Sequence, residues 1–240
     1  MTTGFATLAA RNRQPELMDQ PGLDEQLHAH ALRCLSRINW ISRTSTMIWR
    51  PIRKLALKRP GPLRILDVAC GGGDVAIGLA RRAARAGIDV QVDGCDINPV
   101  TVEHARANAL SAGVKQVGFF VHDALTIPHP DGYDVVTCSL FLHHLDDLDA
   151  ERMLRSMGAA AGQMVVASDL LRNRFSYLMA VVACHVLTRS PIVHVDGPLS
   201  VAAAFTLNEA RALAERAGLS GAAFSRYFPE RFLFVWRRPS

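Results

Sequence analysis

This sequence has little of what marks secreted, disulfide-stabilised or membrane-spanning proteins. Its five cysteines are an odd number without metal-site spacing, so they indicate packing in a reducing cytoplasm, not disulfide bonds. Residues 1–10 contain neither a charged leader nor a long apolar core, so we expect no signal peptide. The most apolar window, residues 175–188, is shorter than the roughly twenty residues that a membrane span needs. We therefore expect a buried or interfacial helix there, forming a wall of a substrate pocket.

Acidic residues are also absent from one long stretch, residues 26–66. The net charge of the whole chain is only +5, which gives no indication of a nucleic-acid partner. Apolar residues such as Trp40 and Trp49 lie among the basic ones, so we expect residues 1–60 to form a helical lid over a binding pocket. A basic lid would attract an acidic or phenolic substrate, or contact an anionic membrane surface. The basic residues of the stretch are Arg33, Arg37, Arg43, Arg50, Arg53, Lys54, Lys58, Arg59 and Arg64.

The rest of the chain, residues 61–240, alternates strand-like and helix-like apolar patterns. A chain of 240 residues can bury one full core, so we expect a single sheet domain with the lid as an addition. The alternation predicts an α/β fold with a doubly wound, mostly parallel sheet. Expected strands cover residues 64–68, 90–96, 117–122, 134–140 and 163–168, and expected helices cover residues 74–86, 99–113 and 148–157.

Before this alternation begins, we expect a flexible segment and two helices. The flexible segment covers residues 2–21, and the helices cover residues 24–39 and 44–57. We expect the second helix to be interrupted near Pro51, because proline removes a hydrogen bond from a helix interior.

After the fifth strand we expect a helical insertion, at about residues 170–204. Pro191, Gly197 and Pro198 predict a loop within it. A capping box of Thr206 and Glu209 then begins another helix. The last two strands are separated by only two residues, so they must form an antiparallel hairpin.

Residues 63–76 carry the strongest chemical signal in the chain. An apolar strand ends in Asp67, the glycines 71–73 follow, and a helix pattern then begins. Such a turn lets a ligand lie against bare backbone. The glycines also fit the G-x-G-x-x-A pattern of dinucleotide sites, but Asp67 would repel a diphosphate there. S-adenosylmethionine, a nucleoside cofactor with an amine and a sulfonium, suits an acidic strand end better.

Polar residues also follow the other predicted strands. The carboxyl ends of neighbouring parallel strands form the ligand crevice of open α/β sheets. We expect Asp96 to accept hydrogen bonds from the ribose hydroxyls, and Asp123 to accept one from the adenine amino group. The alternatives are that Asp96 caps a helix and that Asp123 is a loop carboxylate. Ile97 would lie against the adenine ring, and the Ala124 backbone would bond to a ring nitrogen. Ser139 ends the fourth strand at the same crevice.

These segments resemble the motifs of class I S-adenosylmethionine-dependent methyltransferases. Residues 66–73 (LDVACGGG) resemble the first motif, residues 96–99 (DINP) the acidic second motif and residues 122–124 (HDA) the adenine motif. Residues 133–145 resemble the fourth-strand motif of the ubiquinone-methyltransferase-like branch. The resemblance covers about residues 63–237, and it implies the strand order 3-2-1-4-5-7-6 with strand seven antiparallel.

The resemblance also implies that the first motif binds S-adenosyl-L-methionine. The residues concerned are Asp67, Ala69, Gly71 and Gly73. Ala69 is a departure from the family pattern, because many members carry glycine at that position.

A phenolic or enolic acceptor needs a base to remove its proton. His143 and His144 follow the fourth strand, near where the methyl group should face, and they are the candidate catalytic residues. Adjacent helical residues point about 100° apart, so we expect only one of them to face the methyl group. We predict no metal site, because the two histidines lack the i, i+4 spacing of helical ligand pairs.

We predict methyl transfer to a small hydrophobic acceptor, as O-methylation of a phenolic or polyketide-like natural product. C-methylation of a quinone precursor is the alternative within this class, and an NAD(P)-dependent oxidoreductase is the alternative from another class. We expect a small-molecule partner, no nucleic acid, and a monomer or homodimer, with peripheral membrane contact left open. The candidate substrate-binding residues are Trp40, Tyr177, His185 and His194.

Overall fold

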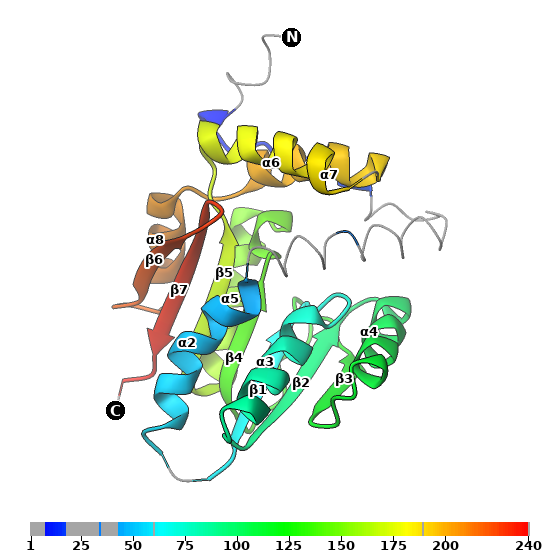
Figure 1. The fold of residues 1–240 in the computed structure, drawn as a ribbon. Coiled ribbons are helices and arrows are strands. Elements are labelled where there is room, and N and C mark those ends of the chain that lie inside the picture. The colour runs from blue at the N-terminus through cyan, green and yellow to red at the C-terminus, as the bar shows by residue number, and fades with distance from the viewer. Residues whose placement is uncertain (1–7, 18–33, 35–42, 60, 189, 240) are drawn as a thin grey trace.

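The computed structural model describes residues 8–17, 34, 43–59, 61–188 and 190–239. Their core is a sheet of seven strands in the order β3-β2-β1-β4-β5-β7-β6 (Figure 1). Strand β7 is antiparallel to both β5 and β6, and the other pairs are parallel. The predicted α/β fold, strand order and closing hairpin are therefore confirmed. The strands are β1 (Leu63–Val68), β2 (Val90–Asp96), β3 (Val117–Val121), β4 (Tyr133–Ser139), β5 (Ala161–Leu170), β6 (Ala223–Tyr227) and β7 (Arg231–Arg237).

Helices cover both faces of this sheet, and two more lie beyond its edge. Side chains of α2, α3 and α4 pack in the core of one face, and those of α5 and α8 in the core of the other. Figure 1 shows α6 and α7 as a pair beyond the end of β5. The helices are α2 (Thr44–Ala56), α3 (Asp74–Arg85), α4 (Pro99–Ser111), α5 (Asp147–Ala160), α6 (Arg174–Leu187), α7 (Pro191–Ala203) and α8 (Leu207–Arg216), with a 3₁₀ turn, η3, at Leu142–His144.

The central strand β1 is apolar on both faces because both are covered. Leu63 and Ile65 belong to the α2–α3 side of the core, whereas Leu66 and Val68 belong to the other side. This alternation follows from the two-residue period of a strand. It places Asp67 on the side of α3, at the carboxyl end of the strand.

The interruption predicted at Pro51 is wrong, because α2 runs through this residue as one helix. Ile48 and Ile52 flank the proline and are fully buried in the core. Their burial offsets the hydrogen bond that proline removes. This helix packs on the sheet and on α3, so it contributes to the core of the sheet domain. A lid formed by the preceding residues stays a prediction, because residues 18–33 and 35–42 lie outside those described.

The loop predicted at residues 190–200 is also wrong, because helix α7 spans it. Pro191 occupies the first turn of α7, where its missing N–H has no helical partner in any case. Gly197 lies against α6, where an added Cβ would overlap the sulfur of Cys184. The glycine therefore serves the close packing of two helices, and tertiary contact overrides its tendency to break a helix.

Helix α6 exposes much of its apolar surface, so the structure excludes a buried helix and leaves the predicted alternative of an interfacial helix. Within it, Ser176 and Cys184 are buried. Phe175, Val182 and Val186 have more than half of their surface exposed (58%, 53% and 75%). None of the helices in the described ranges is long and apolar enough to cross a bilayer.

The described residues 8–17 form a fixed N-terminal strap, although the sequence predicts flexibility there. The Arg11 side chain donates hydrogen bonds to the carbonyl oxygens of Ala203 (2.8 Å) and Leu145 (2.7 Å). The Arg13 side chain donates to the carbonyl oxygen of His144 (3.0 Å). The strap thereby bridges η3 and the end of α7. Arginine makes this possible because its several N–H groups bind several carbonyls at once.

Gly73 and Gly87 lie at the two ends of α3 and offer a matched pair of substitutions. Gly73 has a φ of 78°, and an added Cβ would lie 2.6 Å from the Phe119 ring. Gly87 has a φ of 63°, and an added Cβ would meet no atom within 4 Å. We expect Gly87→Ala to lower the free energy of unfolding by about 1 kcal/mol through strain alone. Gly73→Ala should lower it by about 3 kcal/mol, because overpacking is added. Urea unfolding measures both values, and equal losses would contradict this account.

Candidate active site

The glycine loop after β1 and the end of β2 are joined at the carboxyl edge of the sheet, where open α/β sheets bind ligands, and we call this place the crevice. The Gly71 amide donates a hydrogen bond to Asp96 Oδ2 (3.0 Å), and the Asn98 amide donates to Asp96 Oδ1 (3.0 Å). The Asn98 side chain, and not that of Asp96, caps α4. The structure thus excludes the helix-cap alternative for Asp96, whose carboxylate instead joins two strand ends.

The loop itself needs left-handed backbone conformations. Gly71 has a φ of 53° and Ala69 also has a φ of 53°, a conformation that glycine adopts most easily. An added Cβ at Gly71 would meet no atom within 4 Å, so the space beside this glycine is open. The positive φ at Ala69 gives a physical reason for glycine at this position of the resembling family. A planar or elongated ligand can approach the bare backbone at Gly71.

Asp67 is the most unusual group of the crevice. Its side chain is 1% exposed, and neither carboxylate oxygen makes a hydrogen bond within the described part of the chain. Burial raises the pKa of Asp67 well above its usual range, and the nearby carboxylates of Asp74 and Asp96 raise it further, whereas the Ala76 amide lowers it. Such a group favours a cationic or hydrogen-bond-donating ligand and disfavours a diphosphate. The residues therefore fit S-adenosylmethionine, the amine-bearing cofactor that the family resemblance implies.

Asp123 lies at the end of β3 but is already engaged in a loop. Its carboxylate accepts hydrogen bonds from the Leu125 amide (3.0 Å) and the Thr126 hydroxyl (2.6 Å), which lower its pKa. The predicted loop-carboxylate alternative thus describes its present contacts, and its bond to adenine stays a prediction. Ile97 is 63% exposed and so presents a free apolar surface. Ala124 packs against the core, next to Asp123.

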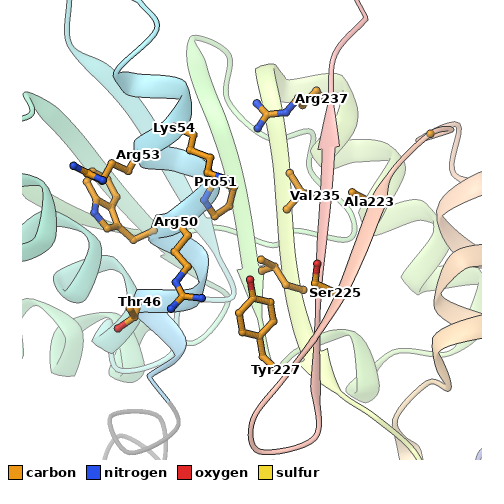
Figure 2. Close-up of a pocket in the computed structure, with 13 residues that line it drawn as sticks. Thr46, Arg50, Pro51, Arg53, Lys54, Ala223, Ser225, Tyr227, Val235 and Arg237 are labelled. Carbon is orange, nitrogen blue, oxygen red and sulfur yellow. The ribbon is translucent and has the colours of Figure 1, made fainter.

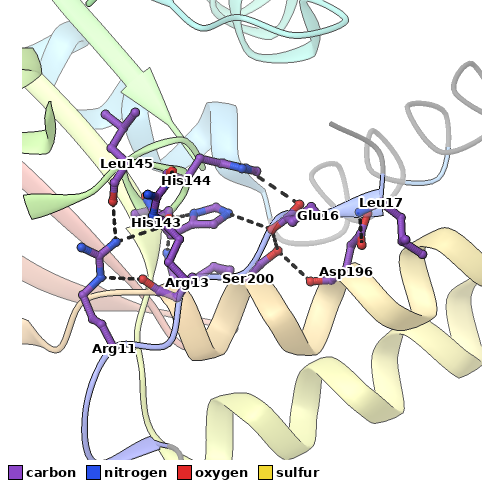
Figure 3. A network of polar contacts seen from close by, with 12 residues as sticks. Arg11, Arg13, Glu16, Leu17, His143, His144, Leu145, Asp196 and Ser200 are labelled. Atoms are coloured by element: carbon purple, nitrogen blue, oxygen red, sulfur yellow. Dashed lines mark hydrogen bonds and ion pairs between the residues drawn. The ribbon is translucent and has the colours of Figure 1, made fainter. Parts of the chain in front are cut away.

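A second polar group lies at the ends of β4 and β5 (Figure 3). Ser139 ends β4, and η3 follows it with His143 and His144. Asp169 in β5 accepts hydrogen bonds from His143 Nδ1 (2.6 Å) and from the His143 amide (3.0 Å). Burial acts to raise the pKa of Asp169, but the charge and hydrogen bonds of His143 lower it overall. In the neutral form of His143, a carboxylate that accepts the Nδ1 proton leaves the lone pair on Nε2.

Glu16 of the N-terminal strap faces both histidines. Its carboxylate oxygens lie 3.9 Å from His143 Nε2 and 4.0 Å from His144 Nε2. The Ser200 hydroxyl donates a hydrogen bond to Glu16 Oε1 (2.5 Å). Both imidazoles therefore face one carboxylate, and the expectation that only one of them faces the methyl group stays a prediction. The two rings lie with centroids 4.3 Å apart, because side-chain rotation offsets the divergence of neighbouring Cβ atoms.

The sequence did not identify three acidic residues of the crevice and of the second polar group as site residues. Asp169 ends a strand, and the same rule that singles out Asp67 and Asp96 also applies to it. Asp74 directly follows the glycine loop, but the sequence pattern marks it only as the start of a helix. Nothing in the sequence near Glu16 signals a site, because its partners lie far along the chain.

Two of the predicted substrate-binding residues, His185 and His194, lie together and away from Glu16. Trp40 lies outside the described residues, and Tyr177 is partly buried on α6. His185 and His194 stack on each other, with ring centroids 4.3 Å apart. His194 belongs to α7 and lies six residues before Ser200, about 9 Å along the helix axis. The structure thus brings these two histidines together at a separate end of the α6–α7 pair, and their role in binding stays a prediction.

A basic groove lies elsewhere, on the sheet face between α2 and the β6–β7 hairpin (Figure 2). It has a volume of about 730 Å³, and Trp49 and Tyr227 are among its lining residues. None of the predicted cofactor-binding or catalytic residues lines it. Part of the basic stretch thus lies on this face instead of at the strand ends. The cationic lining residues are Arg50, Arg53, Lys54 and Arg237.

Comparison with known sequences identifies a common domain. The family described as "Methyltransferase domain" matches residues 65–161. A ubiquinone biosynthesis O-methyltransferase of Bordetella parapertussis is 32% identical over 188 residues, which are 77% of this chain and 66% of that protein. The enzyme of the same name from Yersinia pestis is 35% identical over 139 residues, 55% of this chain and 54% of that protein. The chain thus covers less than two thirds of these relatives.

Solved structures share the fold at low sequence identity. Magnesium protoporphyrin IX methyltransferase from Synechocystis with bound SAH superposes with a TM-score of 0.58 at 17% identity, covering 92% of this chain and 91% of that one. The S-adenosylmethionine-dependent methyltransferase SibL superposes with a TM-score of 0.66 at 17% identity, covering 99% of this chain and 66% of that one. At this sequence identity, the two structures show that the fold of sheet and helices is shared.

The burial of Asp67 predicts an unusual pH dependence of stability. A carboxyl group with a raised pKa binds its proton more tightly in the folded chain than in the unfolded chain, where its pKa is about 3.9. The free energy of unfolding therefore falls as pH rises above about 4, until the folded group is ionised. We expect Asp67→Asn to remove this fall and to raise stability near neutral pH by about 1 kcal/mol. Urea unfolding between about pH 5 and 8 measures it, with exposed Asp131→Asn as the unchanged control. A less stable Asp67→Asn protein at neutral pH would contradict this prediction.

Proposed function

Because this chain belongs to the class I S-adenosylmethionine-dependent methyltransferases, we propose that it methylates an oxygen atom of a small hydrophobic acceptor. The observation that carries the proposal is the buried, unpaired carboxylate of Asp67 beside an open glycine loop. Asp74 and Asp96 add negative charge to the same place. A positively charged adenosyl donor offsets this charge, whereas a dinucleotide diphosphate would increase the repulsion.

Different residues of the crevice bind different parts of S-adenosylmethionine, the methyl donor. When bound, S-adenosylmethionine supplies a methyl group that is already activated by a positively charged sulfur. Asp67 holds the amino end, and Asp96 accepts hydrogen bonds from the ribose. Ile97 covers one face of the adenine, and Asp123 accepts a hydrogen bond from its amino group. Their main contribution is orientation, because an in-line displacement depends on alignment of the reacting atoms.

The acceptor lies at the polar group of Glu16, His143 and His144. There the acceptor hydroxyl loses its proton, a carbon–oxygen bond forms and the carbon–sulfur bond breaks. Asp169 holds the His143 ring so that the Nε2 lone pair faces this place. That lone pair can take up the proton directly or bind a cation that acidifies the hydroxyl. Asp169 is therefore a positioning residue in either case.

A phenolic acceptor has the best support among oxygen nucleophiles. The curated relatives carry the name ubiquinone biosynthesis O-methyltransferase. All five cysteines are buried thiols outside any disulfide bond, which supports the expected cytoplasmic setting.

Ligand-induced stabilisation tests the donor. We expect S-adenosylhomocysteine at about 100 times its Kd to stabilise the fold by about 2.7 kcal/mol, and NADH to have no effect. Asp96→Ala should remove the response to S-adenosylhomocysteine, whereas Asp131→Ala should keep it. Thermal unfolding with each ligand measures the shift. Stabilisation by NADH alone would refute the proposal.

Asp169→Asn tests the acceptor side. The amide can present an N–H to His143, which favours the wrong tautomer, so we expect kcat with a phenolic acceptor to fall about a hundredfold. The KM for the acceptor and the affinity for S-adenosylhomocysteine should change little, because neither ligand contacts Asp169. Steady-state kinetics and calorimetric titration separate these quantities. An unchanged kcat would show that the orientation of His143 is irrelevant to the reaction.

A further inference from the structure

Glu16, His143 and His144 converge on one point from two distant parts of the chain. One ligand-type atom from each lies within 4.8 Å of those of the other two. In the described ranges no other group of three such side chains converges in this way. Glu16 and His143 are buried, and the His144 side chain is 24% exposed, so the point is enclosed but reachable from one side.

Neighbouring groups orient two of these three side chains, His143 and Glu16, as metal ligands are oriented. Asp169 accepts the Nδ1 proton of His143 (2.6 Å), which leaves Nε2 as the electron-pair donor. Ser200 donates a hydrogen bond to Glu16 Oε1 (2.5 Å) and so fixes the carboxylate. Carboxylate–histidine–metal chains and hydrogen-bonded ligand carboxylates are the usual surroundings of catalytic metal ions.

We propose that Glu16, His143 and His144 form a binding site for a divalent transition-metal ion, with zinc as the best match. The ion would lie between the two imidazoles and the Glu16 carboxylate, whose Oε1 is now 3.9 Å from His143 Nε2 and whose Oε2 is 4.0 Å from His144 Nε2. A contraction of a few tenths of an ångström gives the roughly 2.0–2.2 Å bonds of zinc to imidazole and carboxylate. Two imidazoles select zinc, cobalt, iron or manganese over magnesium, which prefers oxygen ligands.

The proposed ion deepens the proposed function, on which its role in the reaction depends. Three protein ligands leave a coordination position open, as in catalytic zinc sites. An acceptor hydroxyl bound there loses its proton to water, because coordination lowers its pKa. The oxygen would then be held as an anion at the ends of β4 and β5. The strap becomes part of the site, since it supplies Glu16.

Cobalt binding tests this site without any methyl acceptor. We expect the full chain, freed of metal by a chelator and dialysed, to bind about one Co²⁺ with a visible d–d absorption band, and Zn²⁺ to displace it. Glu16→Gln, which keeps the shape of the side chain, should weaken binding tenfold or more, and Asp169→Asn should weaken it about tenfold to a hundredfold. His144→Ala should abolish the band.

The second histidine pair provides the control. His185→Ala and His194→Ala remove one ring each from the stacked pair on α6 and α7, and both should bind Co²⁺ like the wild type. Absence of Co²⁺ and Zn²⁺ binding, or full binding by Glu16→Gln, would overturn the proposed ion. If S-adenosylhomocysteine still stabilises the metal-free protein in that case, the proposed function stands alone. If Co²⁺ binds as expected but no phenol is methylated, the ion stands and the proposed function fails.

Discussion

The structure depends most on one unfavourable group, the carboxylate of Asp67 buried at the end of β1. It lies on the central strand of the sheet, covered by α3 and closed in by the glycine loop. No hydrogen bond within the described residues compensates its burial, and two further carboxylates lie nearby. Stability alone would favour an apolar residue here. The arrangement is explained if the crevice binds a positively charged ligand. The positive charge of that ligand would compensate the negative charges of the carboxylates gathered there.

A second constraint joins the beginning of the chain to the middle of the sheet. The N-terminal strap is held by backbone carbonyls of η3 and α7, and it carries Glu16 to the ends of β4 and β5. The proposed donor crevice and the proposed acceptor group therefore have different origins. Consecutive strand–turn–helix units build the crevice, whereas a long-range contact builds the acceptor group.

Most of the fold could be predicted from local patterns. The strands of the sheet, the capping box at Thr206 and the closing hairpin follow from hydrophobic periodicity and short-range hydrogen bonding. The errors lie where tertiary packing overrides local preference. Pro51 is tolerated because Ile48 and Ile52 are fully buried, and Gly197 continues a helix because α6 needs the space. For α6, the exposed apolar residues exclude a buried helix and leave the predicted alternative of an interfacial helix.

The sequence by itself determined the sheet, the glycine loop and the alignment of Asp67 and Asp96 at one edge, because parallel strands bring all their carboxyl ends to the same side. It also placed His143 and His144 after β4. Only the tertiary structure decided that Asp169 orients His143, that Asp74 adds to the charge around Asp67, and that Glu16 faces both imidazoles. These contacts join residues with no shared local pattern, so their geometry exists only once the chain has packed.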